Sequence, residues 1–395
     1  MTAEMARVLG RVFVGAAALL VAFVLRSSTA QAYPQWQLLS GSVRCNQCHY
    51  APAGGGLINS YGRDAAGEDL STFGGNGALL HGALPALPSW LALGGDLRGA
   101  LVANDVQDPN GPTWAAFPMQ ADLYARFALP VGLSIYATGG VRGQERGGAD
   151  IVPDQNYQPL YVSRFISREH YLMWQPEALG PYVRAGRFFA PFGLRLAEHI
   201  TYIRRDLGFN QLEESYNLSA GAVYEAWELH ATLFAPDFIR HIGSDEKGLA
   251  VYFERRLLSD QLALGAQTRL ASGPGVTRFI LGGVGKYWLP PARTMFIAEV
   301  DVVQMLFDSD AVGTRGQLVA AAGAVVAPLR GLLLTALGER NQVDLQVRDS
   351  AWNAASLFVN WFPYAHVEVE MMGRLQFPSG GATAKTFLAQ IHYYL

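Results

Sequence analysis

From residue 90 to residue 395 the chain repeats short segments in which polar and apolar residues alternate, and Gly, Pro, Asp and Asn separate these segments. Successive side chains of a β-strand point to opposite faces of the sheet. In residues 121–129, for example, Leu123 and Phe127 would lie on one face and Asp122 on the other. Segments of about 10 residues with this pattern are typical of transmembrane β-barrels.

The composition argues against most other structures. Hydrophobic residues make up 50% of the chain and charged residues only 16%, which is unusual for a soluble domain. After Leu25 no apolar run approaches the roughly 20 residues of a spanning helix, and a closed barrel is the other structure that satisfies its backbone in lipid. A soluble β-sandwich would alternate similarly, but not usually as one unit over roughly 300 residues. The net charge of -3 argues against nucleic acid as a partner.

The C-terminus carries a second indication of an outer-membrane barrel. One face of the last segment carries only apolar and aromatic side chains, namely Phe387, Ala389, Ile391, Tyr393 and Leu395. This arrangement resembles the terminal signal of bacterial outer-membrane proteins, in which an aromatic residue stands third from the end. Phenylalanine is usual at the final position, where this chain has Leu395.

We therefore predict an all-β fold, a transmembrane antiparallel β-barrel of about 16 strands, the even number expected of a bacterial barrel. The predicted strands are 91–103, 118–129, 131–143, 160–175, 179–189, 217–226, 227–235, 247–257, 261–270, 276–288, 292–305, 315–327, 330–340, 353–363, 364–375 and 385–395. A barrel of this size encloses a lumen that can be an aqueous channel or can hold a plug.

Both cysteines of the chain lie in the sequence Cys45-Asn46-Gln47-Cys48-His49. This spacing is that of a c-type haem site, in which each thiol bonds one vinyl group and the following histidine reaches the iron. The alternatives are a thioredoxin-like dithiol, half of a zinc site and a structural disulfide. A dithiol should begin a helix in a strand-helix-strand unit, and a zinc site would need further Cys or His ligands at typical spacing. We predict one covalent haem c bound by Cys45 and Cys48, with His49 as an iron ligand.

Residues 1–32 have the features of a secretory signal peptide. A basic start is followed by an apolar run over residues 14–25 and by the small-residue site Ala30-Gln31-Ala32 before Tyr33. The run is shorter than the roughly 20 residues that span a bilayer, although an uncleaved anchor is the alternative. Export agrees with the motif, because bacteria attach c-type haem outside the cytoplasm.

The segment 33–89 between the signal peptide and the barrel is rich in glycine and has little periodicity. Below about 70 residues a domain seldom builds a sufficient core alone. We therefore expect this haem segment to pack in or against the lumen of the barrel formed by residues 90–395. The alternative is a small free cytochrome domain on the periplasmic side, organised by the haem itself.

The order of these parts resembles the fused cytochrome-porin family of outer-membrane proteins, which includes iron-oxidising members. In that family a single haem motif is followed by a Pro, an aromatic-Gly-Arg and a porin-like barrel. Pro52 and Tyr61-Gly62-Arg63 match here, whereas the Gly54-Gly55-Gly56 insert and Tyr61 in place of the usual Phe depart from the pattern. The resemblance is specific over residues 33–70. It implies electron transfer across the outer membrane, between a periplasmic c-type cytochrome or other soluble carrier and an extracellular redox partner such as iron.

Other residues are candidates for contact with the haem. His81 is the nearest later candidate for the second axial ligand, and Met119 or an open position are the alternatives. Arg63 is a candidate partner for a propionate, because arginine forms bidentate pairs with carboxylates. Tyr61 and Tyr50 are candidates to pack on the macrocycle.

A second functional class is an anion porin whose haem-bearing plug senses or gates. The sequence Gly186-Arg187-Phe188-Phe189-Ala190-Pro191-Phe192-Gly193 resembles a motif of phosphate-selective porins, and a basic segment with Arg195, His199, Arg204 and Arg205 follows it. Guanidinium groups at a constriction would attract anions. A hydrolase is not indicated, because the sequence shows no nucleophile and base at the spacing of a catalytic motif. An iron-oxidase-like or peroxidase activity stays open.

The haem assignment makes a direct prediction. Replacing Cys45 and Cys48 together with alanine removes both points of attachment. We expect haem staining of the protein to be lost on a denaturing gel, where noncovalent haem dissociates. A stained band from the double variant would refute the assignment.

Overall fold

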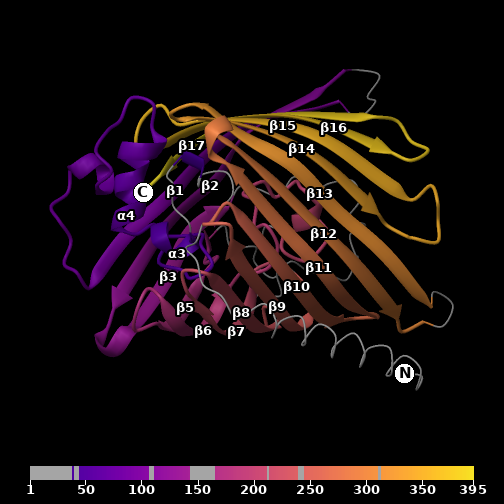
Figure 1. The fold of residues 1–395 in the computed structure, drawn as a ribbon, viewed down its shortest axis with the longest axis horizontal. Helices are drawn as coiled ribbons and strands as arrows, with labels where there is room; N and C mark the ends of the chain where they lie inside the picture. Colours follow the sequence, from indigo (N-terminus) through magenta and orange to yellow (C-terminus); the bar gives the residue numbers. More distant parts are fainter. Residues whose placement is uncertain are drawn as a thin grey trace.

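The computed structural model describes residues 38–39, 44–105, 111–142, 165–210, 213–238, 244–309 and 313–395. Within these ranges the chain forms a closed antiparallel β-barrel (Figure 1). Consecutive strands pair with each other, and the first strand, β1, pairs with the last, β17, to close the barrel. The predicted signal peptide, residues 1–32, lies outside the described residues.

The sheet has sixteen barrel strands within the described ranges, as predicted. Their bounds are β1 (Leu91–Asp105), β2 (Thr113–Ala128), β3 (Leu133–Arg142), β4 (Phe165–Ile166), β5 (His170–Trp174), β6 (Gly180–Phe188), β7 (Ser215–Val223), β8 (Trp227–Ala235), β9 (Lys247–Leu257), β10 (Leu262–Gly273), β11 (Val276–Leu289), β12 (Thr294–Phe307), β13 (Thr314–Leu329), β14 (Leu332–Gln342), β15 (Ala351–Trp361), β16 (Val367–Pro378) and β17 (Ala384–Tyr394). The short β4 and β5 both pair with β3 and form one interrupted strand.

Apolar side chains cover the outside of the barrel, whereas its inner face carries polar and charged side chains together with a buried apolar cluster. Leu123 is 72% exposed, whereas its neighbour Asp122 is 3% exposed. On the last strand Phe387 and Ile391 are exposed and His392 is buried. The predicted alternation is thus confirmed, with one face of each strand suited to lipid and the other to a polar interior.

The two ends of the barrel differ. Short turns such as 224–226 and 330–331 connect the strands at one end, which also holds the start of β1 and the end of β17. Most connections at the other end are longer, such as 236–246 and 343–350. Outer-membrane barrels have short periplasmic turns and longer extracellular loops. We therefore take the short-turn end as periplasmic and the long-loop end as extracellular.

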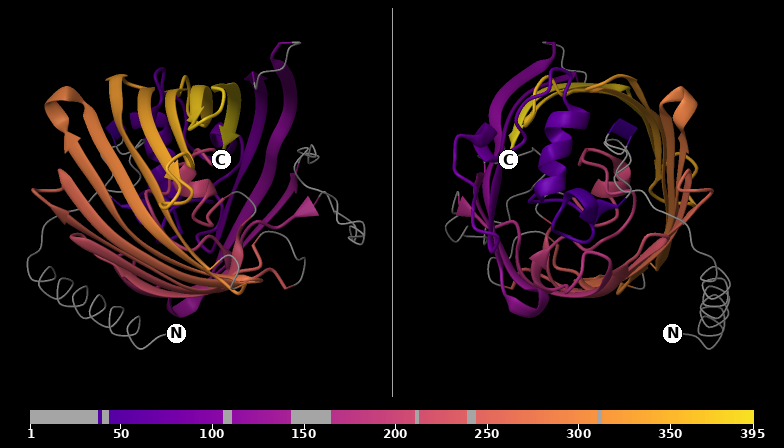
Figure 2. Two further views of the ribbon diagram at one scale, coloured as in Figure 1. Left: turned by 90° about the vertical axis from the view of Figure 1, so that its right-hand side faces the viewer. Right: turned by 60° about the vertical axis from the view of Figure 1, so that its left-hand side comes forward.

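The N-terminal segment, defined here as residues 44–77, packs inside the barrel (Figure 2). It contains α3 (Cys45–Cys48), α4 (Ser60–Ala65) and η1 (Ala66–Leu70). Asn46 donates to the Ala178 carbonyl at 2.5 Å, and the Leu57 N–H donates to the Tyr136 hydroxyl at 3.2 Å. None of the helices in the described ranges is long and apolar enough to cross a membrane. The described segment is thus packed in the lumen and is not a separate domain.

A second piece of chain enters the lumen from the opposite end. Strand β6 ends at Phe188, and residues 189–210, which we call the inward loop, fold into the barrel before β7 begins. The loop contains the short helix α5 (Tyr202–Arg205), which contacts β13 and β14. The N-terminal segment and the inward loop therefore fill the lumen from opposite ends.

A charge on the lipid-facing side of β12 tests the orientation of the strands. Val300 lies near the middle of β12 and faces outward. We expect Val300→Arg to lower the free energy of unfolding by about 2–4 kcal/mol, the cost of Arg at the bilayer midplane, as measured by denaturant unfolding in lipid vesicles. Leu329→Arg, at the end of β13, is the matched control, with an expected loss of about 0–1 kcal/mol. Equal losses from the two variants would contradict the assigned orientation.

Candidate haem site

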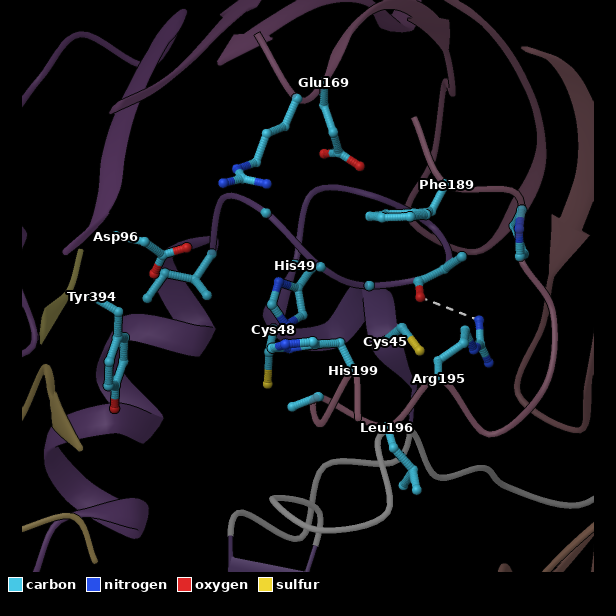
Figure 3. A pocket seen from close by; sticks show the side chains of 18 of the residues that line it. Cys45, Cys48, His49, Asp96, Glu169, Phe189, Arg195, Leu196, His199 and Tyr394 are labelled. Carbon is cyan, nitrogen blue, oxygen red and sulfur yellow. Dashed lines mark hydrogen bonds between the residues drawn. The ribbon is translucent and has the colours of Figure 1, made fainter. Parts of the chain in front are cut away.

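A cavity of about 360 Å³ lies between the N-terminal segment and the inward loop. Cys45, Cys48 and His49 line it from the N-terminal segment, and His199 lines it from the inward loop (Figure 3). Strand residues complete the wall, among them Met119 of β2. Cavities of roughly 300–1,000 Å³ inside a barrel are typical sites for small molecules and cofactors.

The haem motif folds as a single helical turn. Helix α3 spans Cys45–Cys48, and the backbone of His49 is extended immediately after it. Both cysteines are free thiols. A methyl group on Gly62 would lie 2.5 Å from the Cys48 carbonyl oxygen, so this position needs glycine for α4 to pass against the motif. The glycine of the Tyr61-Gly62-Arg63 sequence therefore shapes the site by close packing.

The three-glycine insert folds the chain around His49. Gly54, Gly55 and Gly56 have φ values of 79°, 81° and 58°, in the left-handed region that favours glycine. All three line the cavity. Burial lowers the pKa of His49 to about 4, although hydrogen bonds with the backbone of Gly56 and Gly55 oppose this shift. His49 is therefore neutral at neutral pH, the form in which imidazole binds a metal.

The sequence predicts His199 only as part of a basic segment that could attract anions, and not as a residue of the haem site. Burial and the nearby Arg204, Arg98 and Arg168 lower its pKa to about 4, so this imidazole is also neutral. In Figure 3 the rings of His49 and His199 both point into the space beside Cys48. The sequence carried only a weak signal for this, a histidine within the basic segment expected to fold toward the lumen.

The structure does not bring His81 to the haem motif. His81 lies in η2 (Leu79–Gly82), is exposed, and packs beside His366 and Tyr393 at ring-centroid distances of 5.2 and 5.8 Å. The preceding chain is fixed to the short-turn end, where the Thr72 N–H donates to the Phe362 carbonyl at 2.7 Å. Proximity in sequence is therefore misleading here, because this anchoring carries His81 to the periplasmic rim.

Arg63 and Tyr61 also lie apart from the cavity, as does His81; none of the three is among the described residues that line it. The Arg63 guanidinium donates to the Leu93 carbonyl, and Tyr61 is 42% exposed. Adjacent residues of a helix point about 100° apart. Because Gly62 faces Cys48, its two neighbours are directed elsewhere, and the structure gives their predicted haem contacts no support.

Arginines surround the cavity, and many of them are paired with carboxylates. Arg187 contacts Asp237 at 2.5 Å, Arg195 contacts Glu228 at 2.8 Å, and Arg168 contacts Asp122 at 2.8 Å. The paired charges offset one another, so they attract free anions less than isolated arginines would. Arg98, Arg168 and Arg184 line the cavity, where guanidinium groups suit the propionates of a haem.

The residues of the cavity fit a covalent haem. Two thiols and a neutral histidine lie on one side, and the apolar side chains of Phe189, Leu196 and Ile203 supply surface for a macrocycle. No group of three or more His, Cys, Asp or Glu suited to a metal ion occurs in the described ranges. Haem iron does not require such a group, because the porphyrin supplies four ligands and the protein supplies only the axial ones.

No family model and no curated protein matches the chain, but many solved structures do. OmpT of Vibrio cholerae superposes with a TM-score of 0.58 at 11% identity, covering 78% of this chain and 99% of OmpT. OprB of Pseudomonas putida superposes with a TM-score of 0.59 at 9% identity, covering 77% of this chain and 94% of OprB. An anion-selective porin from Comamonas acidovorans superposes with a TM-score of 0.55 at 10% identity, covering 77% of this chain and 99% of that porin.

The chain is an outer-membrane β-barrel. This follows from the closed sheet, its apolar outer face and its likeness to these structures. Identities of 9% to 11% show a shared fold and do not transfer a function. The function of this protein therefore depends on the residues that fill its own lumen.

Arg195 tests whether the inward loop holds the N-terminal segment in place. It donates to Glu228 at 2.8 Å and to the Ala53 carbonyl at 3.2 Å, joining barrel, loop and segment. We expect Arg195→Ala to lower the free energy of unfolding by about 1.5–3 kcal/mol, the worth of hydrogen bonds to a charged group. Limited proteolysis should also cleave residues 44–58 faster.

The matched control is Arg205→Ala in the same loop. Arg205 is partly exposed and pairs with Asp206 at 3.2 Å. An exposed pair contributes about 0–1 kcal/mol, so this variant should resist proteolysis as the wild type does. Identical cleavage rates for the two variants would show that Arg195 is not the link.

Proposed function

We propose that this protein carries electrons through one haem, bound covalently by Cys45 and Cys48, between an extracellular redox partner and a periplasmic carrier. We further propose that it belongs with the fused cytochrome-porin proteins that its residues 33–70 resemble. The observation that supports this most is the cavity inside the barrel, whose lining includes Cys45, Cys48 and the imidazoles of His49 and His199. A passive pore has no use for a covalently attached redox group.

The haem would supply an iron that changes oxidation state with little movement of atoms. The chain's own residues do the rest. Cys45 and Cys48 would fix the position of the group, and His49 would offer the lone pair of an imidazole that burial keeps neutral. Phe189 and Leu196, which line the cavity, would keep water away from the macrocycle, and such burial influences the potential of a haem.

The placement of the cavity supports exchange at both faces of the membrane. The N-terminal segment reaches it from the short-turn end and the inward loop from the long-loop end. The apolar band of an outer-membrane barrel is about 25 Å tall, so one haem does not span it and partners must approach closely. We propose a soluble c-type cytochrome at the periplasmic end and a small reductant such as ferrous iron at the other.

An anion channel with a haem-bearing plug is the second candidate. The fold of this chain is compatible with this function, because the similar structures include an anion-selective porin and the outer membrane channel DcaP of Acinetobacter baumannii, which superposes with a TM-score of 0.53 at 12% identity over 79% of this chain and 100% of DcaP. Arg98 and Arg184 line the cavity, as such a channel would need. Against it, the N-terminal segment and the inward loop occupy the lumen, and several lumen arginines are paired with carboxylates.

Reconstitution separates the two functions. Vesicles containing the protein are loaded with an oxidised periplasmic cytochrome, and ferrous citrate is added outside. We expect the trapped cytochrome to be reduced by the wild type and not by His49→Ala, because loss of the axial imidazole disables the iron.

Release of a trapped small anion is measured in the same vesicles. Equal release from wild type and His49→Ala, with no difference in reduction, would favour the channel and contradict electron transfer. A wild-type protein that transfers electrons without releasing the anion would exclude the channel.

A further inference from the structure

We propose that His199 of the inward loop is the second axial ligand of the haem iron, on the side opposite His49. This inference rests on the proposed covalent haem and names the residue that completes its coordination. His199 and His49 line one cavity, beside Cys48, although they belong to segments that enter the barrel from opposite ends (Figure 3).

The inward loop is fixed to the barrel wall on both sides of His199. Before it, the Gly193 N–H donates to Gln267 and the Leu194 N–H donates to Glu299, each at 2.7 Å. After it, the Tyr202 N–H donates to Glu339 at 2.6 Å. Buried wall carboxylates and an amide thus accept from the loop backbone, so the loop cannot slide along the wall without leaving them unpaired.

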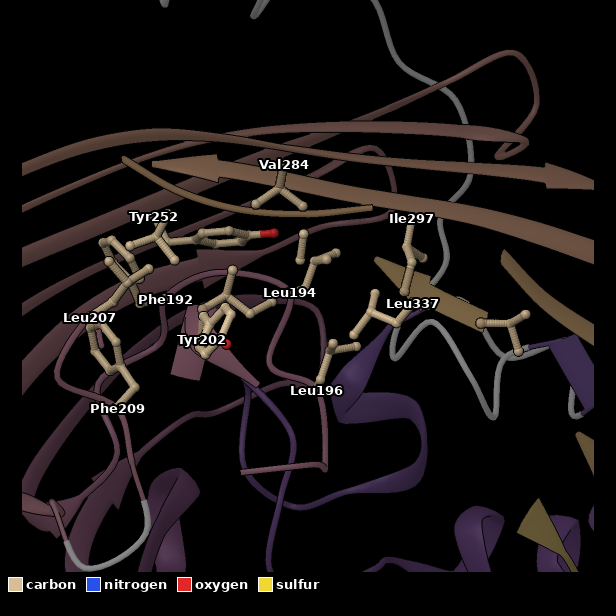
Figure 4. Close-up of a cluster of buried hydrophobic side chains, with 14 of the residues drawn as sticks. Phe192, Leu194, Leu196, Tyr202, Leu207, Phe209, Tyr252, Val284, Ile297 and Leu337 are labelled. Atoms are coloured by element: carbon tan, nitrogen blue, oxygen red, sulfur yellow. The ribbon is translucent and has the colours of Figure 1, made fainter. Parts of the chain in front are cut away.

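Apolar contacts reinforce these hydrogen bonds (Figure 4). Buried loop side chains pack against buried side chains of β9, β11, β12 and β14; the loop supplies Phe192, Leu194, Leu196, Tyr202, Leu207 and Phe209, and the wall supplies Tyr252, Val284, Ile297 and Leu337. Each fully buried side chain of this kind contributes about 1.5–3 kcal/mol. The loop is therefore held as firmly as a core element.

Hydrogen bonds within the loop close the turn that carries His199. Arg204 donates to the Leu196 carbonyl at 2.7 Å, and the Thr201 hydroxyl donates to the Glu198 carbonyl at 2.9 Å. Arg195 links the same stretch to the Ala53 carbonyl of the haem segment. An imidazole on such a braced turn is held in place by the surrounding hydrogen bonds, which is the support that a preorganised ligand needs.

The chemistry of His199 agrees with this placement. An imidazole that lines the cavity can offer a nitrogen lone pair to the iron. Met119 also lines the cavity, from β2, and is the competing ligand. Two imidazoles would give a lower potential than an imidazole and a thioether, since a Met ligand raises the potential of a c-type haem.

The optical absorption and electron paramagnetic resonance spectra of the purified haem protein test the ligand assignment. We expect a six-coordinate, low-spin wild type. His199→Ala should become high-spin with its haem still covalently attached, and added imidazole should restore the low-spin spectrum. His199→Met should stay low-spin, with a potential higher than that of the wild type because a thioether replaces an imidazole.

His81→Ala and Met119→Leu are the matched controls, and both should keep the wild-type spectrum. A low-spin His199→Ala protein without added imidazole, a high-spin Met119→Leu protein, or a high-spin wild type would overturn the assignment. Heat-modifiable migration on gels checks that each variant retains the folded barrel.

The same samples distinguish failure of this inference from failure of the proposed function. A wild type without haem stain on a denaturing gel contradicts the covalent haem itself. A stained wild type whose spectrum is unaffected by loss of His199 contradicts only the ligand assignment.

Discussion

Every feature of this molecule depends on the closure of its sheet. In lipid an unpaired backbone N–H or C=O costs several kcal/mol, so a spanning sheet can have no free edge. Pairing of β1 with β17, in register from Asp96 opposite Tyr394, removes the last two edges. Closure also sets which side chains meet lipid and which meet the lumen, because each strand then has a fixed inside and outside.

The closed barrel creates a second requirement, which is that a polar lumen be filled without leaving charges unpaired. Buried ions are costly unless they are paired and hydrogen-bonded. Arg374 and Glu339 form a buried pair on the wall, and the same Glu339 also accepts from the inward loop at Tyr202. Glu228 similarly forms ion pairs with both Arg256 of the wall and Arg195 of the inward loop. Wall and filling are thus electrostatically complementary, which fixes the position of the cavity.

The strands could be predicted because their information is local. Alternation with a period of two is visible in any short window, and each of the sixteen predicted ranges overlaps an observed strand or the interrupted pair β4 and β5. The break between those two, where Arg168 turns inward to Asp122, follows from a contact with β2 that no local pattern contains. The two-residue period predicts that a strand exists, but it does not predict where a contact inside the lumen interrupts that strand.

The candidate haem site likewise has a part that local sequence predicts and a part that it does not. Cys45, Cys48 and His49 are adjacent in sequence, so their spacing alone carries the chemical prediction. The second imidazole depends on tertiary structure, because anchors on the wall decide which histidine reaches the cavity. His81 follows the motif more closely in the chain but is held at the rim, whereas His199 is delivered by a loop from the opposite end. Sequence distance is a poor guide wherever the barrel imposes the path.

This division between two segments bears on how the lumen would work. A haem bonded to the N-terminal segment at Cys48 and coordinated by the inward loop at His199 would join the two pieces that fill the barrel. Before either piece could move aside, both the coordinate bond to the iron and the contacts with the wall would have to break. Electron transfer would benefit, because an iron held from both sides would reorganise little, and the same link would hinder the passage of solutes. The bridging haem would thus favour the redox function over the channel function in this barrel.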